Sequence, residues 1–172
     1  MTNHPKKERT FVAIKPDGIQ RGLIGEIIKR FERVGLKLVA LKMIVVDESH
    51  IEKHYEELDE KMRRFLVKYM TSGPVVAMVW EGAHAVKLVR KLIGSTEPYS
   101  SDVGTIRGDF VLDSYAISDQ DERAVRNLIH ASGNMEEAEA EIVHWFGENE
   151  VINYRLVQEE ILYDVNLDGI LE

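Results

Sequence analysis

Residues 74–80 read Pro-Val-Val-Ala-Met-Val-Trp, a continuous apolar run. A short run without polar positions is typical of a strand that is buried on both faces at the centre of a sheet. Downstream, the pattern of residues 83–93 predicts a helix that ends at Gly94, and upstream the pattern of residues 62–70 predicts another. The middle of the chain therefore alternates helix, strand and helix.

The same periodicity extends the pattern toward both ends. We expect strands at residues 9–14 and 36–46, with an amphipathic helix at residues 22–34 between them. A short helix at residues 49–58 would be capped by Ser49, and a further helix is expected at residues 134–146. This order indicates an α+β sandwich. Periodicity alone leaves the order of the strands open.

Composition limits the classes of function. Residues 1–7 are polar and patternless, so we expect a flexible tail followed by a single domain over residues 8–172. The chain has no cysteine, which excludes disulfides and thiol catalysis and suits a reducing cytoplasm. It has no apolar run of membrane-spanning length, and its net charge of −8 opposes binding to nucleic acid. We therefore expect a cytoplasmic protein that binds neither a membrane nor nucleic acid.

One histidine stands in a position suited to chemistry. Residues 127–132 read NLIHAS, in which a short apolar run predicts a buried strand that delivers His130 to the edge of the sheet. A histidine in such a run is more often a hydrogen-bonded core residue than a catalyst. Three cations elsewhere favour the catalytic interpretation, because Lys15, Arg90 and Arg107 together predict a clamp for phosphate groups.

These segments, in this order, closely resemble nucleoside diphosphate kinases, which pass a γ-phosphate between nucleotides through a phosphohistidine. The resemblance covers about Glu8 to Phe146, and its most specific blocks are ERTFVAIKPDG at 8–18, SGPVVAMVWEG at 72–82 and GTIRGDF at 104–110. It implies a ferredoxin-like fold with a four-stranded antiparallel sheet covered by helices. It also implies nucleoside di- and triphosphates as substrates, Mg²⁺ as cofactor and a homo-oligomer. A non-catalytic nucleotide-binding or regulatory module on the same scaffold is the alternative function.

The resemblance also assigns roles to individual side chains. His130 matches the nucleophile, which suits it because a neutral imidazole attacks phosphorus without a separate base. Glu141 matches the carboxylate that orients this imidazole, although a solvated glutamate is the alternative. The remaining matches are the phosphate-binding Lys15, Arg90, Arg107 and Thr96, Tyr55 packed near the histidine, and Asn127 at the sugar hydroxyls.

The chain departs from the family pattern in several places. Ala131 and Gly133 replace the usual residues around Ser132, and Met62 stands where a base-stacking phenylalanine is usual. As a base contact, Met62 would tolerate every base, whereas the alternative places it in the core. The segment 112–126 is longer than usual and acidic, so we expect it to be solvent-exposed, with a brief helix near Asp121, and to lie outside the phosphate clamp.

Neither of two metal-like patterns is convincing. His50 and His54 have helical i, i+4 spacing but do not form an H-E-x-x-H motif, so we expect an exposed helix face. Residues 164–169 match only the first half of an EF-hand loop, so a tail or a subunit contact is favoured over calcium binding. We expect no metal site made by the protein itself, because magnesium would arrive on the nucleotide phosphates.

Overall fold

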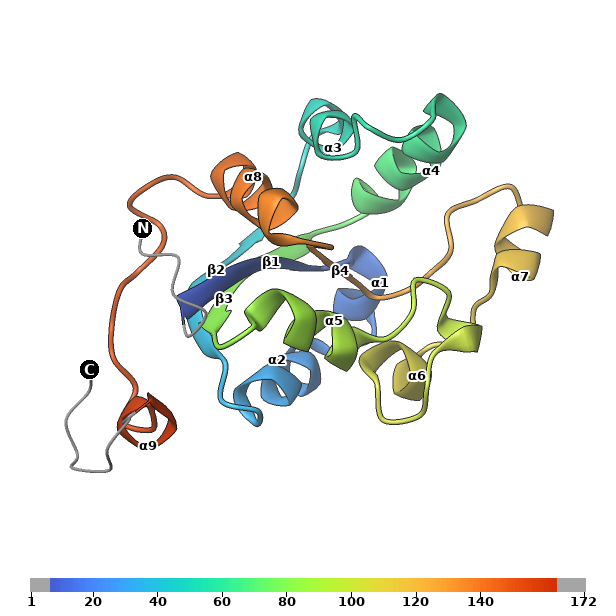
Figure 1. Cartoon of the computed structure of the whole chain (residues 1–172). Helices are drawn as coiled ribbons and strands as arrows, with labels where there is room; N and C mark the ends of the chain where they lie inside the picture. Colours follow the sequence, from blue (N-terminus) through green and yellow to red (C-terminus); the bar gives the residue numbers. More distant parts are fainter. Residues whose placement is uncertain (1–6, 164–172) are drawn as a thin grey trace.

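The computed structural model describes residues 7–163 of the chain. Its centre is a four-stranded antiparallel sheet in the order β2-β3-β1-β4 (Figure 1). Strand β3 (Val75–Gly82) is buried at every position, as the apolar run predicted. It lies between β1 (Glu8–Ile14) and β2 (Lys37–Ile44), and the short β4 (Ile129–Ala131) pairs with the other side of β1. The expected ferredoxin-like α+β sheet is confirmed.

Helices cover both faces of this sheet. One layer holds α3 (Glu48–His54), α4 (Glu60–Met70) and α8 (Met135–Trp145), and the other holds α2 (Ile24–Glu32) and α5 (Ala85–Ile93) (Figure 1). Successive strand residues point to opposite faces. Phe11 and Ala13 therefore pack under the first layer, while Val12 and Ile14 pack on the second.

One helix of the first layer, α3, has a different N-cap residue from the one that the sequence predicted. The predicted cap Ser49 is wrong, because Asp47 is the N-cap of α3 and accepts from the amide of His50 at 2.8 Å. Ser49 instead donates its hydroxyl to the same carboxylate at 2.7 Å. A carboxylate at this position also favours the positive end of the helix dipole. Helix α3 ends at His54, four residues before the predicted end.

Several short elements were not predicted. They are α1 (Pro16–Gln20), the 3₁₀ turn η2 (Pro98–Ser100), α6 (Ile106–Phe110) and α9 (Glu159–Tyr163). Each is five residues or fewer, which is too short for an apolar period of 3.6 to become visible. Proline supplies the first helical residue of α1, and the Thr105 hydroxyl caps α6 by accepting from the amide of Gly108.

The long segment 112–126 contains helix α7 (Tyr115–Gln120), close to the predicted position. The expectation of full solvent exposure is wrong for Asp113, Ser118 and Ala124, which are buried. Asp113 accepts two bonds from the Arg123 guanidinium, at 2.6 and 3.0 Å, and one from the Arg126 amide at 2.6 Å. One carboxylate therefore ties the two ends of the segment together.

The C-terminal part of the described chain lies against the edge strand β2. The amide of Ile152 donates to the Val39 carbonyl at 2.8 Å, and the Tyr154 hydroxyl donates to the Leu38 carbonyl at 2.7 Å. Both contacts fall in the first half of this strand. Within residues 7–163 no helix has the length and apolar character to cross a membrane. The EF-hand-like residues 164–169 and residues 1–6 of the predicted tail lie outside the described residues.

Candidate active site

Strand β4 places His130 on one face of the sheet and its neighbours on the other. Ile129 and Ala131 pack into the core under α5, so the imidazole between them faces α3 and α8. There His130 Nε2 lies 2.6 Å from Glu141 Oε1, on α8. Because a carboxylate only accepts hydrogen bonds, the proton sits on Nε2 and the lone pair on Nδ1. The geometry therefore leaves Nδ1 as the unprotonated ring nitrogen.

Glu141 is itself held in place. Its second oxygen, Oε2, accepts from the Ser132 hydroxyl at 2.5 Å. Ser132 is fully buried, and its oxygen also accepts from the Phe11 amide at 3.3 Å. The changes at Ala131 and Gly133 leave this arrangement intact. Glu141 is therefore held against the imidazole, and it is not the solvated residue of the alternative interpretation.

The expectation of an exposed histidine face on α3 is wrong. The His54 side chain is 1% exposed, and its ring centroid lies 4.7 Å from that of His130. The ring of His50 stacks on that of His144 at 4.0 Å. Burial first, and then the nearby His130, lower the pKa of His54 to about 2, so its ring stays neutral. Helical spacing alone could not show which face of α3 meets α8.

A hydrogen bond from a tryptophan fixes the tautomer of His54. The Trp145 indole donates to His54 Nδ1 at 3.1 Å, so the ring proton is on Nε2, 3.6 Å from Glu141 Oε1. His54, His130 and Glu141 are the one group in the described residues whose donor atoms lie as close together as those of a metal site. A protonated Nε2 has no lone pair for a metal. The Nε2 atoms of both histidines lie near Glu141 Oε1, at 3.6 Å and 2.6 Å.

Tyr55 follows His54 and lies in the same pocket. Its ring centroid is 6.1 Å from that of His130 and 4.4 Å from that of His54. Burial, and then the charge of Glu141, raise the pKa of Tyr55, so the phenol stays protonated. The predicted position near the histidine agrees with this placement.

Lys15 lies directly after β1, where it is the N-cap residue of α1. Its ammonium donates to Asn127 Oδ1 at 2.8 Å and lies 5.1 Å from the centre of the Tyr69 ring. Burial, followed by the positive charge of Arg107, lowers the pKa of Lys15 to about 7. The group is poised for a negative ligand, which would restore its charged form.

Arg107 is bound almost entirely to backbone. Its guanidinium donates to the carbonyls of Gly94, Ser95, Asn127 and Ile129, at 2.7 to 3.2 Å. Burial, and then the charge of Arg90, lower the pKa of Arg107 to about 10. These bonds hold β4 against the loop after α5. Arg107 therefore builds the site as well as giving it positive charge.

Three other residues that the sequence predicted for the site lie at different depths. Arg90, on α5, reaches the Ala131 carbonyl at 3.4 Å, next to His130. Thr96 is exposed, and its carbonyl accepts from Asn127 Nδ2 at 3.0 Å. Met62 is 39% exposed and lines a cleft beside α4, so the core interpretation of Met62 is wrong.

Sequence reasoning missed three residues that position this site: His54, Trp145 and Tyr69. The Tyr69 hydroxyl accepts from the backbone amide of Asn127 at 3.3 Å, and the cations of Lys15 and Arg126 lie 5.1 and 4.4 Å from the centre of its ring. Its spacing from Met62, about two helical turns, was the available signal. Trp145 gave no such signal in the sequence, because an aromatic residue on the apolar face of a helix usually belongs to the hydrophobic core.

Comparison with known proteins identifies the family of this chain. The family model described as nucleoside diphosphate kinase matches residues 8–151. Nucleoside diphosphate kinase B of Rattus norvegicus is 51% identical over 160 residues, covering 91% of this chain and 97% of that protein. The human nucleoside diphosphate kinase B is 49% identical over 160 residues, with the same coverage of both proteins.

Solved structures agree in three dimensions. A nucleoside-diphosphate kinase from Borrelia burgdorferi, with bound vanadate and ADP, superposes with a TM-score of 0.87 at 43% identity, covering 91% of this chain and 96% of that one. A halophilic nucleoside diphosphate kinase from Halobacterium salinarum, in complex with CDP, gives a TM-score of 0.82 at 42% identity, covering 91% and 99%. The chain belongs to the nucleoside diphosphate kinase family.

Proposed function

We propose that this chain transfers the γ-phosphate of a nucleoside triphosphate to a nucleoside diphosphate through a phosphohistidine at His130. The observation that carries the proposal is the 2.6 Å contact between His130 Nε2 and Glu141, which leaves Nδ1 as the attacking nitrogen. Lys15 binds Asn127 and Arg90 binds the Ala131 carbonyl, so both cations lie beside the segment that carries His130. A binding module would not need a reactive imidazole with an oriented tautomer.

The reaction follows from these roles. Nδ1 attacks the γ-phosphorus, the bond between that phosphorus and the β-phosphate oxygen breaks, and the nucleoside diphosphate leaves. The proton on Nε2 stays on the ring, where Glu141 stabilises the positive charge that develops on the imidazole. In the second half a β-phosphate oxygen of another diphosphate attacks the same phosphorus and breaks the N–P bond. Lys15, Arg90 and Thr96 contact the phosphoryl oxygens, and Asn127 contacts the sugar.

We propose that Mg²⁺ enters with the nucleotide and is held mainly by phosphate oxygens and water. The Glu141 carboxylate already binds His130 and accepts from Ser132, and the other charged side chains are an ammonium and guanidinium groups, which are not the hard oxygen ligands that Mg²⁺ prefers. When bound, the ion would neutralise phosphate charge. The side chains of the chain bind and orient the rest of the nucleotide.

Labelling with γ-labelled ATP and magnesium tests the chemistry. We expect acid-labile, alkali-stable label on the wild-type protein and none on a His130→Asn variant, because asparagine lacks the attacking nitrogen. His84→Asn is the matched control, because His84 is exposed and its left-handed backbone (φ 54) suits asparagine. Label that persists in His130→Asn, or is lost in His84→Asn, contradicts the assignment.

We also propose a cytoplasmic homo-oligomer. The second half of the β2 edge carries Leu41, Met43 and then Val45, which are 50%, 54% and 77% exposed. An apolar strand edge of this kind favours pairing with another chain. Mass measurement in solution tests the assembly, and a monomer at all concentrations contradicts it. The cytoplasmic location rests on the absence of cysteine.

A further inference from the structure

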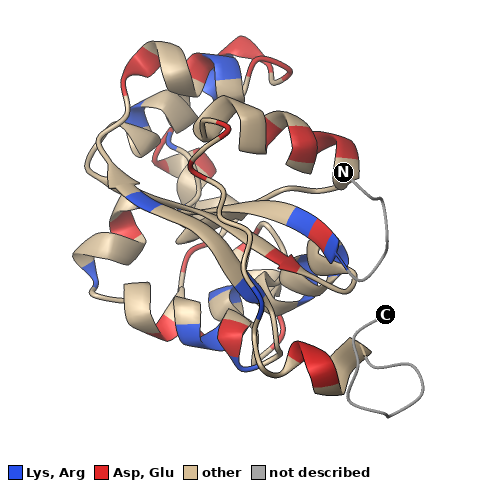
Figure 2. Ribbon diagram, turned by 90° about the vertical axis from the view of Figure 1, so that its left-hand side faces the viewer, with Lys and Arg blue, Asp and Glu red and all other residues tan. Residues whose placement is uncertain are grey.

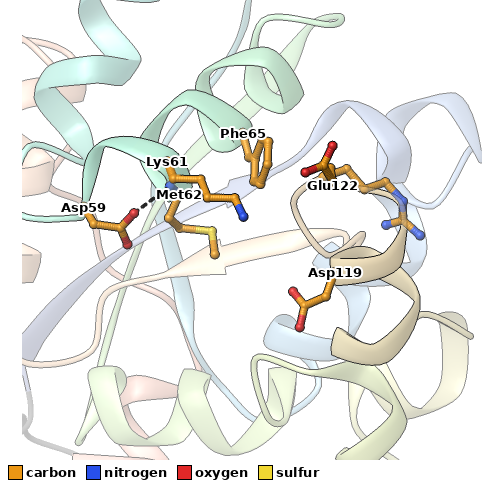
Figure 3. Close-up of a pocket in the computed structure, with 7 residues that line it drawn as sticks. Asp59, Lys61, Met62, Phe65, Asp119 and Glu122 are labelled. Atoms are coloured by element: carbon orange, nitrogen blue, oxygen red, sulfur yellow. Dashed lines mark hydrogen bonds between the residues drawn. The ribbon is translucent and has the colours of Figure 1, made fainter.

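The long segment 112–126 forms one wall of a cleft. Lys61, Met62 and Phe65 line it from α4, and Asp119, Glu122 and Arg123 line it from α7 and the turn after it. Figure 3 shows the two walls facing each other across open space. The cleft holds about 210 Å³, which is less than the ~300–1,000 Å³ of pockets for drug-sized ligands. This size suits a single planar base.

Helix α4 connects this cleft to the phosphate clamp. Met62 lines the cleft, and Tyr69, two turns later on the same face of the helix, contacts Lys15 and Asn127. Seven residues of helix span about 10 Å, comparable with the reach of a nucleoside diphosphate from base to phosphate. A nucleotide with its phosphates at Lys15 and His130 therefore brings its base toward the cleft.

The α7 wall is fixed relative to the clamp. Asp113 binds both Arg123 and the amide of Arg126, and the Arg126 guanidinium lies 4.4 Å from the centre of the Tyr69 ring. Arg123 also pairs with Asp121 at 3.1 Å. Its guanidinium is thus paired with Asp113 and Asp121, and no ion pair with Asp119 or Glu122 is found among the described residues. Asp119 and Glu122 therefore keep their acceptor oxygens for a ligand.

The two walls offer different chemistry to a base. Met62 and Phe65 present apolar surface to the flat face, which every base shares. The carboxylates of Asp119 and Glu122 present only acceptors to the edge. Guanine offers a ring N–H and an adjacent amino group as two neighbouring donors, and Lys61 can meet its carbonyl oxygen. Adenine and cytosine offer one amino group, and thymine offers one N–H between two carbonyls.

We propose that Asp119 and Glu122 read the edge of the base and make guanine nucleotides the preferred substrates of this chain. The proposal rests on the proposed function, because the phosphate clamp sets where the base lies. All bases remain substrates, since the apolar wall does not discriminate among them. The segment 112–126 thus acts on specificity through its α7 wall.

Inosine diphosphate is the sharpest probe, because it differs from guanosine diphosphate only by the missing amino group. The phosphorylated protein, freed of nucleotide, is mixed with each diphosphate and the loss of label is followed. We expect kcat/KM to be about fivefold to tenfold higher for guanosine diphosphate, as for one well-placed pair of base contacts. The double variant Asp119→Asn, Glu122→Gln should bring the ratio close to one.

Glu57→Gln is the matched control, because Glu57 is an exposed acid near α4 that does not line the cleft. It should keep the wild-type ratio. Equal rates for the two diphosphates in the wild type, or an unchanged ratio in the double variant, overturn the proposal. Calorimetric binding of both diphosphates, with the same fold-differences expected, tests the same preference without chemistry. Failure of the proposed function appears separately, as a protein that never accepts label.

Discussion

The two ends of the proposed nucleotide site are built differently. At the phosphate end Lys15, Arg107 and Asn127 are 3 to 4% exposed and bonded to each other or to backbone. At the base end Met62 is 39% exposed, and Asp119 and Glu122 are exposed. The chemistry is the same for every nucleotide and needs a rigid frame. The base varies, so a more open and adaptable wall suffices there.

We expect the largest effect from Arg107→Lys, which removes hydrogen bonds at the phosphate end. Lysine cannot reach the four carbonyls that the planar guanidinium serves, so some are left without donors. We expect the free energy of unfolding to fall by about 3 kcal/mol and transfer to slow about a hundredfold. Denaturant titration and single-turnover labelling measure both. Arg21→Lys, which loses one exposed bond to a carbonyl, should change neither; wild-type stability in Arg107→Lys contradicts the account.

The pH profile tests the charge of Lys15. Its pKa is lowered to about 7 in the free protein, so less of the ammonium remains as the pH rises. We expect kcat/KM to fall roughly fivefold from about pH 7 to about pH 8, while kcat, measured with phosphate bound, falls only at higher pH. Lys15→Arg, whose charge is permanent, should remove the decline. A flat kcat/KM profile for the wild type would show that Lys15 keeps its charge.

The same group affects stability with a definite sign. Between about pH 7 and pH 10.5 the folded protein binds fewer protons at Lys15 than the unfolded chain does, so this group makes the free energy of unfolding rise with pH. Below about pH 7 Lys15 is charged in both the folded and the unfolded protein, so the burial of its ammonium lowers the free energy of unfolding by its full amount. The trend should disappear in Lys15→Met, and denaturant titration at several pH values measures it.

A smaller effect is expected from Asp113, whose bonds to Arg123 and to the Arg126 amide brace the α7 wall. Burial alone would raise the pKa of Asp113, but the bonds from Arg123 and the backbone amides hold it below its ordinary value. Asp113→Asn should therefore lower the free energy of unfolding by about 1–2 kcal/mol at about pH 7. The difference from wild type should shrink as the pH falls through the lowered pKa of Asp113. Asp121→Asn, at an exposed pair, should cost less than half as much; equal losses would refute the brace.

The smallest effect belongs to Met62→Phe at the open end. A larger ring overlap should lower KM about twofold for purine diphosphates and less for pyrimidine diphosphates. Thermal unfolding should barely change, because the side chain is 39% exposed. Steady-state kinetics with purine and pyrimidine diphosphates decides. A destabilised protein with unaltered KM values would mean that the side chain supports the fold and not the base.

The sequence predicted the parts of this molecule that repeat a pattern. The apolar run at 74–80 marked the central strand, and NLIHAS located His130 on an edge strand. The sequence did not predict the features that depend on a single contact between residues far apart in the chain. Nothing in the spacing of His50 and His54 reveals that Trp145, 91 residues from His54, bonds to its ring. Nothing in the acidic composition of 112–126 shows that Asp113 binds both Arg123 and the amide of Arg126 and so joins the two ends of the segment.

The placement of charge also has a kinetic consequence. Acidic residues are spread over the outer helices and loops (Figure 2), whereas Lys15 and Arg107 are buried inside a chain of net charge −8. An approaching nucleotide, which is also an anion, meets repulsion first and attraction only within about 10 Å, the range that salt leaves unscreened. Moderate salt should therefore speed the encounter by screening the outer acids, while the buried cations keep their hold on the bound phosphates. The outer charge therefore slows the encounter, while the buried cations hold the phosphates once they are bound.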